Sequence, residues 1–204
     1  DFMKQITFKQ YRTIDLVFLS LIAAIFESVA TLATNNWFVK QPMAVSITLT
    51  ITCIAAFRWS YYAFIPALVG SLMHCITSGA TIEQFIYYCG GSLLFLVSIP
   101  LLKRIGKEKV RNDFIIRSFY AIVAYISFAL GRWILSLLFE VSLNNLVVFL
   151  STDILSLLFA IVVLTLAKGG DGLLEDQKSY LLRLDKERRE EEEADLSDPF
   201  NNSY

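Results

Sequence analysis

Three charged residues interrupt long apolar stretches of this 204-residue chain, and they are the residues best suited to chemistry. Glu27 lies in LSLIAAIFESVA, Arg132 in SFALGRWIL and Asp153 in FLSTDILSLLF. A charge at bilayer depth costs roughly 2.5–3.5 kcal/mol or more unless it is paired or hydrated. The three charges therefore predict a polar pocket inside a membrane protein, used for binding or for transport.

Arg132 is followed directly by Trp133, and together they could hold a flat polar ligand. The planar guanidinium would bind a polar substituent, while the indole ring would stack on the ligand. An internal ion pair of Arg132 with Asp153 or with Glu27 is the alternative. The two interpretations are compatible, because a ligand pocket often includes such a pair.

Other candidate ligand contacts lie near the predicted ends of the apolar stretches. Asn36 and Trp37 follow the first stretch and Asn144 precedes the last, so they are either turn residues or a lid over the pocket. His74 and Tyr87 are either interfacial residues or contacts to the ligand.

The apolar residues come in blocks rather than in an amphipathic rhythm, and 55% of the chain is hydrophobic. A membrane-spanning helix needs about 20 mostly apolar residues. We therefore predict an all-α membrane protein with a six-helix transmembrane domain over residues 1–167, followed by an acidic cytoplasmic tail over 168–204 that is helical and then disordered. The predicted spans are Ile14–Ala33, Met43–Phe57, Tyr61–Thr77, Ile82–Leu102, Phe114–Phe139 and Leu146–Ala167.

Basic residues predict the orientation of these spans, because loops rich in Lys and Arg stay in the cytoplasm. The loops on the opposite side contain one basic residue, Lys40. Both termini are therefore expected in the cytoplasm, and the interrupting charges are expected in the outer half of the membrane. The basic residues on the side of the termini, before the tail, are Lys4, Lys9, Arg12, Arg58, Lys103, Arg104, Lys107, Lys109 and Arg111.

The sequence contains no pattern typical of an enzyme. No nucleophile–base pair, phosphate-binding glycine loop or metal-ligand spacing is present. The cysteines Cys53, Cys75 and Cys89 are read as small buried apolar residues. We expect no catalysis, no cofactor, no metal and no nucleic-acid partner, so energy for transport would come from another chain or from an ion gradient.

The first predicted span carries small residues at four-residue spacing, namely Ser20, Ala24 and Ser28. Such a stripe lets another helix approach closely, either within the bundle or from a partner protein. Together with the chain length, six spans and outer-half polarity, this motif resembles the S components, or substrate-binding subunits, of energy-coupling factor (ECF) vitamin transporters. The segments FRWSYYAFIPALVG, GRW, TDILSLLF and DGLLEDQKSYLLRL are similar to the group for hydroxymethylpyrimidine or pyridoxine-type cargo.

This resemblance implies a multi-pass subunit of a bacterial plasma membrane that binds a vitamin from outside. Its partners would be a membrane coupling (T) subunit, contacted through the small-residue stripe, and two cytoplasmic ATPase subunits of the ABC type. Trp37 and Trp133 would stack on the cargo, and Asp153 would hold a ring nitrogen or orient Arg132. Two alternatives remain: a stand-alone proton-coupled carrier using Glu27 and Asp153, and an assembly or scaffold protein without cargo.

Overall fold

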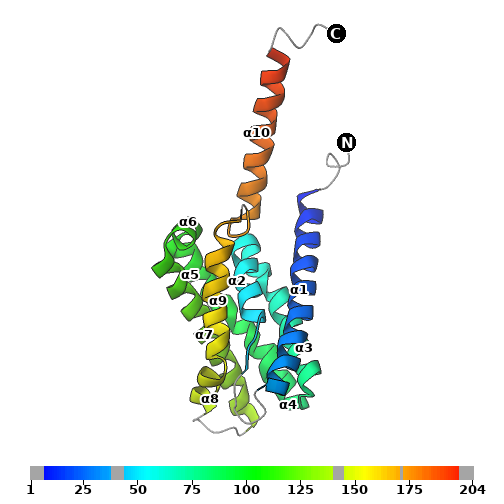
Figure 1. Cartoon of the computed structure of the whole chain (residues 1–204), viewed down its shortest axis with the longest axis vertical. Coiled ribbons are helices and arrows are strands. Elements are labelled where there is room, and N and C mark those ends of the chain that lie inside the picture. Colours follow the sequence, from blue (N-terminus) through cyan, green and yellow to red (C-terminus); the bar gives the residue numbers. More distant parts are fainter. Residues whose placement is uncertain (1–6, 38–43, 140–144, 171, 198–204) are drawn as a thin grey trace.

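The computed structural model describes residues 7–37, 44–139, 145–170 and 172–197, and over these residues the chain is helical, with no strand (Figure 1). This confirms the predicted all-α class. Short 3₁₀ turns and one π turn connect or interrupt the α-helices. The α-helices are α1 (Phe8–Trp37), α2 (Thr48–Trp59), α3 (Phe64–Ser78), α4 (Ile82–Phe85), α5 (Ser98–Ile105), α6 (Lys107–Asn112), α7 (Phe114–Ser136), α8 (Asn145–Thr152), α9 (Ile154–Ala167) and α10 (Gln177–Ser197).

Three of the described helical segments are long and apolar enough to cross a membrane: Phe8–Trp37, Ile82–Ile105 and Phe114–Phe139. A fourth is formed if α8 and α9 make one span, bent by 47° at their junction. Helices α2 and α3 have 12 and 15 residues, which is less than one bilayer thickness for a straight helix. The structure thus has three or four candidate spans, and the count of six stays a prediction.

Helix α1 is longer than expected, because it continues past Ala33 to Trp37. Polar side chains in its last turns donate to carbonyls of the preceding turn. The Thr34 hydroxyl donates to the Ala30 carbonyl, and the Asn36 amide donates to the Leu32 carbonyl over 2.9 Å. The residues read from the sequence as the start of a loop therefore extend the helix.

Helix α2 is the core of the bundle. All of its residues except Ile54 are buried, and it contacts α1, α3, α7 and α9. A helix that is buried on nearly every side by other helices belongs to a protein interior. Its short length is consistent with this position, because α2 begins inside the bundle and not at a surface.

The outward face of α1 carries a continuous row of exposed large apolar side chains. Exposed apolar patches of this size are rare on soluble monomers and are normal where a helix faces lipid. This row supports the interpretation of α1 as a membrane helix. Its members are Ile14, Val17, Phe18, Leu21, Ile25, Phe26, Val29 and Leu32.

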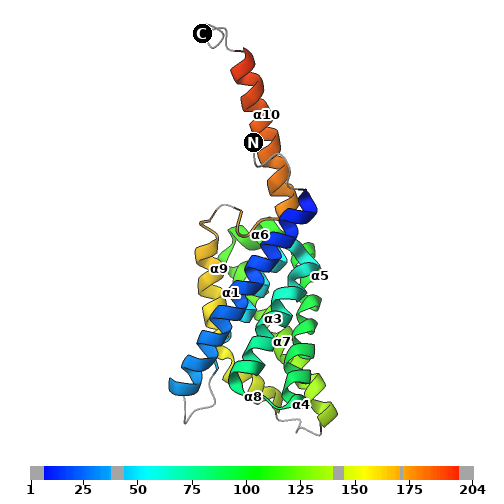
Figure 2. The same ribbon diagram turned by 90° about the vertical axis from the view of Figure 1, so that its right-hand side faces the viewer.

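The segment before α10 is docked on the end of the bundle at which α1 begins, and α10 projects away from that end (Figures 1 and 2). Arg58 makes two hydrogen bonds of 2.8 Å to Asp15 and a third of 2.8 Å to the Gly172 carbonyl. Lys107 donates to Asp176 and to the Phe57 carbonyl, both over 2.6 Å. These bonds join α1, α2, α6 and the tail, and we call them the end clasp.

Candidate functional site

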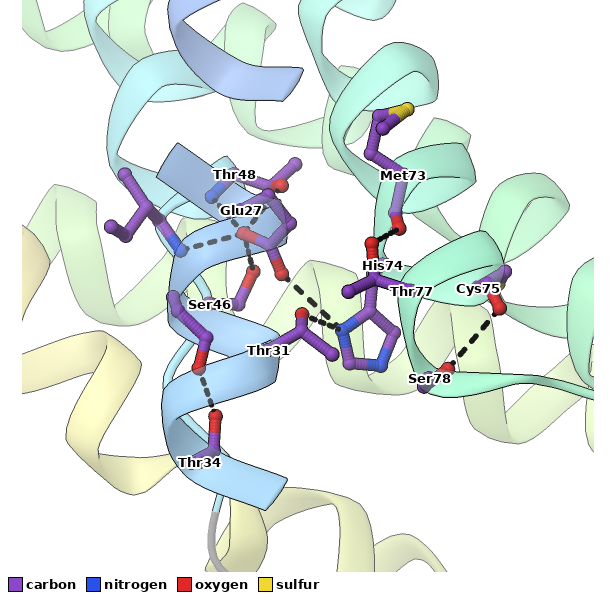
Figure 3. Close-up of polar contacts among 12 residues, drawn as sticks. Glu27, Thr31, Thr34, Ser46, Thr48, Met73, His74, Cys75, Thr77 and Ser78 are labelled. Carbon is purple, nitrogen blue, oxygen red and sulfur yellow. Dashed lines mark hydrogen bonds and ion pairs between the residues drawn. The ribbon is translucent and has the colours of Figure 1, made fainter. Parts of the chain in front are cut away.

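Glu27 is buried in the middle of the bundle, where its carboxylate caps the first turn of α2 (Figure 3). The Oε2 atom accepts hydrogen bonds from the backbone N–H groups of Ile47 and Thr48 over 2.8 and 2.9 Å. It also accepts from the hydroxyls of Ser46 and Thr48 over 3.0 and 2.9 Å. Helix N-termini leave N–H groups unpaired and favour negative charge, and Ile47, at the N-cap position, has no side-chain cap of its own.

The other oxygen of Glu27 points toward His74 on α3 (Figure 3). Its Oε1 atom lies 3.4 Å from His74 Nδ1, which is also 3.0 Å from the Thr31 hydroxyl. No hydrogen bond to Oε1 of normal length is formed by the described residues, although the atom is buried. One carboxylate oxygen is thus fully used in capping, and the second remains available.

The segment that leads into α2 pairs with the junction of α8 and α9. The Ala44 N–H donates to the Thr152 carbonyl over 2.9 Å, and the Ser46 N–H donates to the Ser156 hydroxyl over 2.7 Å. Asp153 lies at the bend between α8 and α9. Two helix ends therefore meet inside the bundle, an arrangement that many transporters use to build binding sites.

Arg132 on α7 forms an ion pair with Asp153 at this bend. The guanidinium carbon also lies 4.7 Å from the centre of the Tyr88 ring. Arg132 is 6% exposed, and its Nε atom has no hydrogen-bond partner among the described residues. Of the two partners that the sequence leaves open for Arg132, the structure selects Asp153.

An aromatic row connects the two charged groups. The Tyr88 ring contacts both Arg132 and His74. The centres of the Tyr88 and His74 rings are 5.0 Å apart. Tyr87 continues the row at 5.1 Å from Tyr88 and 5.9 Å from Phe149. Both tyrosines belong to the π turn Ile86–Gly90, a kind of distortion often found at functional sites.

Two glycines let the π-turn segment approach α7 next to Arg132. A Cβ atom placed on Gly131 would lie 2.0 Å from the Gly91 carbonyl oxygen. A Cβ atom on Gly91 would lie 2.5 Å from the backbone nitrogen of Arg132. Only glycine fits this contact, and the contact brings the tyrosines to the guanidinium.

A small cavity lies beside the Arg132–Asp153 pair. The internal cavity beside Arg132 has a volume of about 10 Å³, which is room for about one water molecule. This cavity would hold a vitamin-sized ligand only after the helices around it had separated. The lining residues are Ser46, Leu49, Tyr125, Phe128, Ala129, Arg132, Asp153 and Ser156.

The structure brings five of the nine predicted ligand contacts into one connected cluster, which we call the polar cluster. These are Glu27, His74, Tyr87, Arg132 and Asp153.

Three of the other four predicted contacts, Asn36, Trp37 and Trp133, are described by the structure and are not part of the polar cluster. Asn36 bonds its own helix, and Trp37 is 78% exposed at the end of α1, so neither forms a lid in this conformation. Trp133 is half-buried, and its indole N–H is buried without a partner among the described residues. Asn144 lies outside the described residues.

Two of the three residues in the small-residue stripe of α1 line a surface groove, and the third does not. Ser20 and Ala24 line a groove of about 450 Å³ between α1 and α3, with Tyr62 and Val69 on its other wall. Ser28 does not line the groove, and its hydroxyl donates to the Ala24 carbonyl over 2.8 Å. The groove is open at the surface of the bundle, where another helix could enter.

The uncharged polar residues of the site were not predicted from the sequence. Ser46, Thr48 and Ser156 supply hydroxyls to Glu27 or to the incoming backbone, and Tyr88 links the charged groups. A signal was present, because the segment SITLTIT places Ser or Thr at every second position of an otherwise apolar run. Hydroxyls in such number are not needed on a lipid-facing helix.

Among the described residues, no three His, Cys, Asp or Glu side chains are close enough to hold a metal ion. No known family model, curated protein or solved structure matches this chain. Its function is therefore inferred from its own residues and their geometry.

Proposed function

We propose that this chain is the substrate-binding subunit of a vitamin importer of the energy-coupling factor type. It would bind a small, flat, water-soluble vitamin or precursor, of the hydroxymethylpyrimidine or pyridoxine kind, at the polar cluster. The observation that supports this most is the meeting of two helix ends inside the bundle, around a buried Arg132–Asp153 pair and a buried Glu27. Charges at such depth are rarely kept without a role in binding or transport.

The cavity beside Arg132 is too small for a vitamin, so binding there would require a movement of the helices around it. A ligand would enter only if the π-turn segment or the α8–α9 bend moved away from α7. Both are interruptions of regular helix, where fewer backbone hydrogen bonds resist a change of angle. Tyr88 would then part from Arg132 and make room for a ring between them, while Arg132 and Asp153 stay paired.

The energy for uptake would come from partner subunits in a bacterial plasma membrane. The groove at Ser20 and Ala24 would receive a helix of the membrane coupling subunit, because small residues permit close helix approach in lipid. ATP would be hydrolysed by two cytoplasmic partners, and we propose no enzymatic step for this chain. With both termini in the cytoplasm, the charged end with α6 and α10 would face those partners.

The test is to identify what the purified protein binds. The protein is extracted in mild detergent, its bound small molecules are analysed by mass spectrometry, and pyridoxine and the hydroxymethyl aminopyrimidine are added in thermal unfolding assays. We expect one compound to co-purify or to raise Tm, and Arg132→Ala to weaken its binding by about 1.5–3 kcal/mol through loss of a charged hydrogen-bond donor. If no small molecule co-purifies or raises Tm, an assembly protein without cargo is favoured instead.

A proton-coupled carrier is the second candidate, and the contact between Glu27 and His74 favours it. Two titratable groups 3.4 Å apart inside a bundle could pass a proton during transport. Liposomes that contain this chain alone distinguish the two functions. Accumulation of cargo driven by a pH gradient, without ATPase subunits, would support the carrier and contradict the subunit.

A further inference from the structure

The charges of the polar cluster do not balance, and this imbalance bears on the ligand. Arg132 is matched by Asp153 through a direct ion pair. Glu27 has no lysine or arginine partner among the described residues, where its neighbours are neutral donors and His74, which is charged only when protonated. With neutral histidine, the described part of the cluster carries one net negative charge.

The capping bonds support the ionised form of Glu27. Four donors converge on one carboxylate oxygen, and a helix N-terminus faces it. Such contacts favour a carboxylate over a neutral carboxyl group. The second oxygen is buried, lacks a normal hydrogen bond and faces the aromatic row.

Arg132 alone would suggest an anionic ligand, but its charge is already in use. An anion that took the guanidinium would leave Asp153 without its counter-ion inside the bundle, which is strongly unfavourable. Its buried Nε–H group has no hydrogen-bond partner among the described residues and is still available to a ligand. A neutral acceptor, such as a ring nitrogen or a hydroxyl group, satisfies that donor.

We infer that this site selects flat heterocycles that are cationic or neutral and carry a hydrogen-bond donor, and that it rejects the corresponding carboxylates. The donor would meet the free oxygen of Glu27, the ring would lie against Tyr88, and an acceptor would meet Arg132. This inference rests on the proposed function, since it concerns the ligand of the same site. It goes beyond that function because it predicts which members of one chemical series bind.

The test uses two matched series of probes on the full chain in lipid nanodiscs. One series is pyridoxamine, pyridoxine and pyridoxic acid, and the other is the aminomethyl, hydroxymethyl and carboxyl forms of the same aminopyrimidine. Within each series only one substituent changes, from cation to neutral group to anion. Binding is measured by isothermal titration calorimetry at neutral pH.

We expect the amine or hydroxymethyl member of at least one series to bind about 100-fold more tightly than its carboxylate, because a like charge is disfavoured at a dry site. A carboxylate that binds as tightly as its neutral partner, or more tightly, would overturn the inference and leave the proposed function intact. Absence of binding in both series would instead overturn the proposed function, and the inference with it.

Two variants test the assignment of charge in opposite directions. Glu27→Gln should reduce the preference against the carboxylate to less than about 10-fold, whereas Glu83→Gln, at an exposed position on α4, should leave it unchanged. Asp153→Asn should improve carboxylate binding, because it frees the charge of Arg132. If neither variant folds, the ranking of the probes on the wild-type chain still decides the question.

Discussion

Glu27 stabilises the N-terminus of α2 whether or not a ligand is bound. Its Oε2 atom takes the bonds that begin α2, and α2 is the core of the bundle. We predict that Glu27→Gln lowers the free energy of unfolding by about 2–3 kcal/mol, because an amide offers one oxygen and no charge to the same donors. Thermal unfolding in detergent measures this, with Glu83→Gln as the exposed control, which should change stability by less than about 0.5 kcal/mol. Equal stability of both variants would contradict the capping role.

The Arg132–Asp153 pair is expected to show strong coupling. Either Arg132→Gln or Asp153→Asn leaves one charge unpaired in the bundle, so each single change should cost about 3–5 kcal/mol. The double variant should cost less than the sum of the two, because it removes both charges together. A double-mutant cycle of unfolding free energies measures the coupling. Additive single effects would show that the pair does not form.

At the scale of single residues, the sequence identifies charges more reliably than their partners. Glu27, Arg132 and Asp153 stand out because ionised groups are rare in apolar runs. The capping role of Glu27 does not stand out, since it depends on where α2 begins in space. Asn36 and Trp37, which the sequence places in a turn or a lid, continue helix α1 in this conformation, with Asn36 bonded to its own helix and Trp37 exposed.

Helices were well predicted as elements, but the role of each helix was not. Apolar stretches predict α1, α3, α7 and α9 near their observed places. The same criterion reads α2 as one more span, although it lies inside the bundle and is too short to cross a membrane alone. Mean hydropathy cannot separate a buried helix from a lipid-facing one, because both contain mostly apolar residues.

The crossing of α2 and α3 depends on Gly70. A Cβ atom at this position would lie 2.1 Å from the Thr48 hydroxyl, which bonds Glu27. We predict that Gly70→Ala destabilises the protein by about 1–3 kcal/mol, although a Gly→Ala change in a helix usually stabilises it. Gly169→Ala is the matched control, since its nearest atom would be 3.5 Å away. A more stable Gly70→Ala protein would show that α2 and α3 have room for a methyl group at this crossing.

The end clasp joins the tail to the bundle and stabilises the fold, although the tail is rich in charged residues. The sequence predicts a charged, solvent-exposed tail. In the structure Gln177 is buried, and its amide donates to the Gly172 carbonyl over 2.6 Å. We predict that a chain ending at Gly170 loses several degrees in Tm, because Arg58 and Lys107 lose their tail partners. A chain ending at Arg188 keeps the clasp and should retain the full Tm. Equal loss in both truncations would place the stabilising contacts after Arg188 instead.

For the whole molecule, the strongest asymmetry is between its two ends. The end with α6 and the start of α10 carries the basic residues of the 103–111 segment, while α4 lies at the opposite end with Glu83 (Figure 1). Positive residues are kept in the cytoplasm, so we predict that the end with α6 faces the cytoplasm and the end with α4 faces outward. The polar cluster would then open toward the outside through the helices near α4 and α8.

Cysteine labelling tests this orientation. In a variant whose three native cysteines are replaced by alanine, Glu108→Cys and Glu83→Cys place one exposed thiol at each end. A membrane-impermeant maleimide should label Glu83→Cys in intact cells and Glu108→Cys only in inside-out vesicles. Detergent should make both accessible, which controls for buried thiols, and the cysteine-free variant should not react. Labelling of Glu108→Cys in intact cells would reverse the orientation and place the basic end outside, where no ATP-hydrolysing partner could reach it.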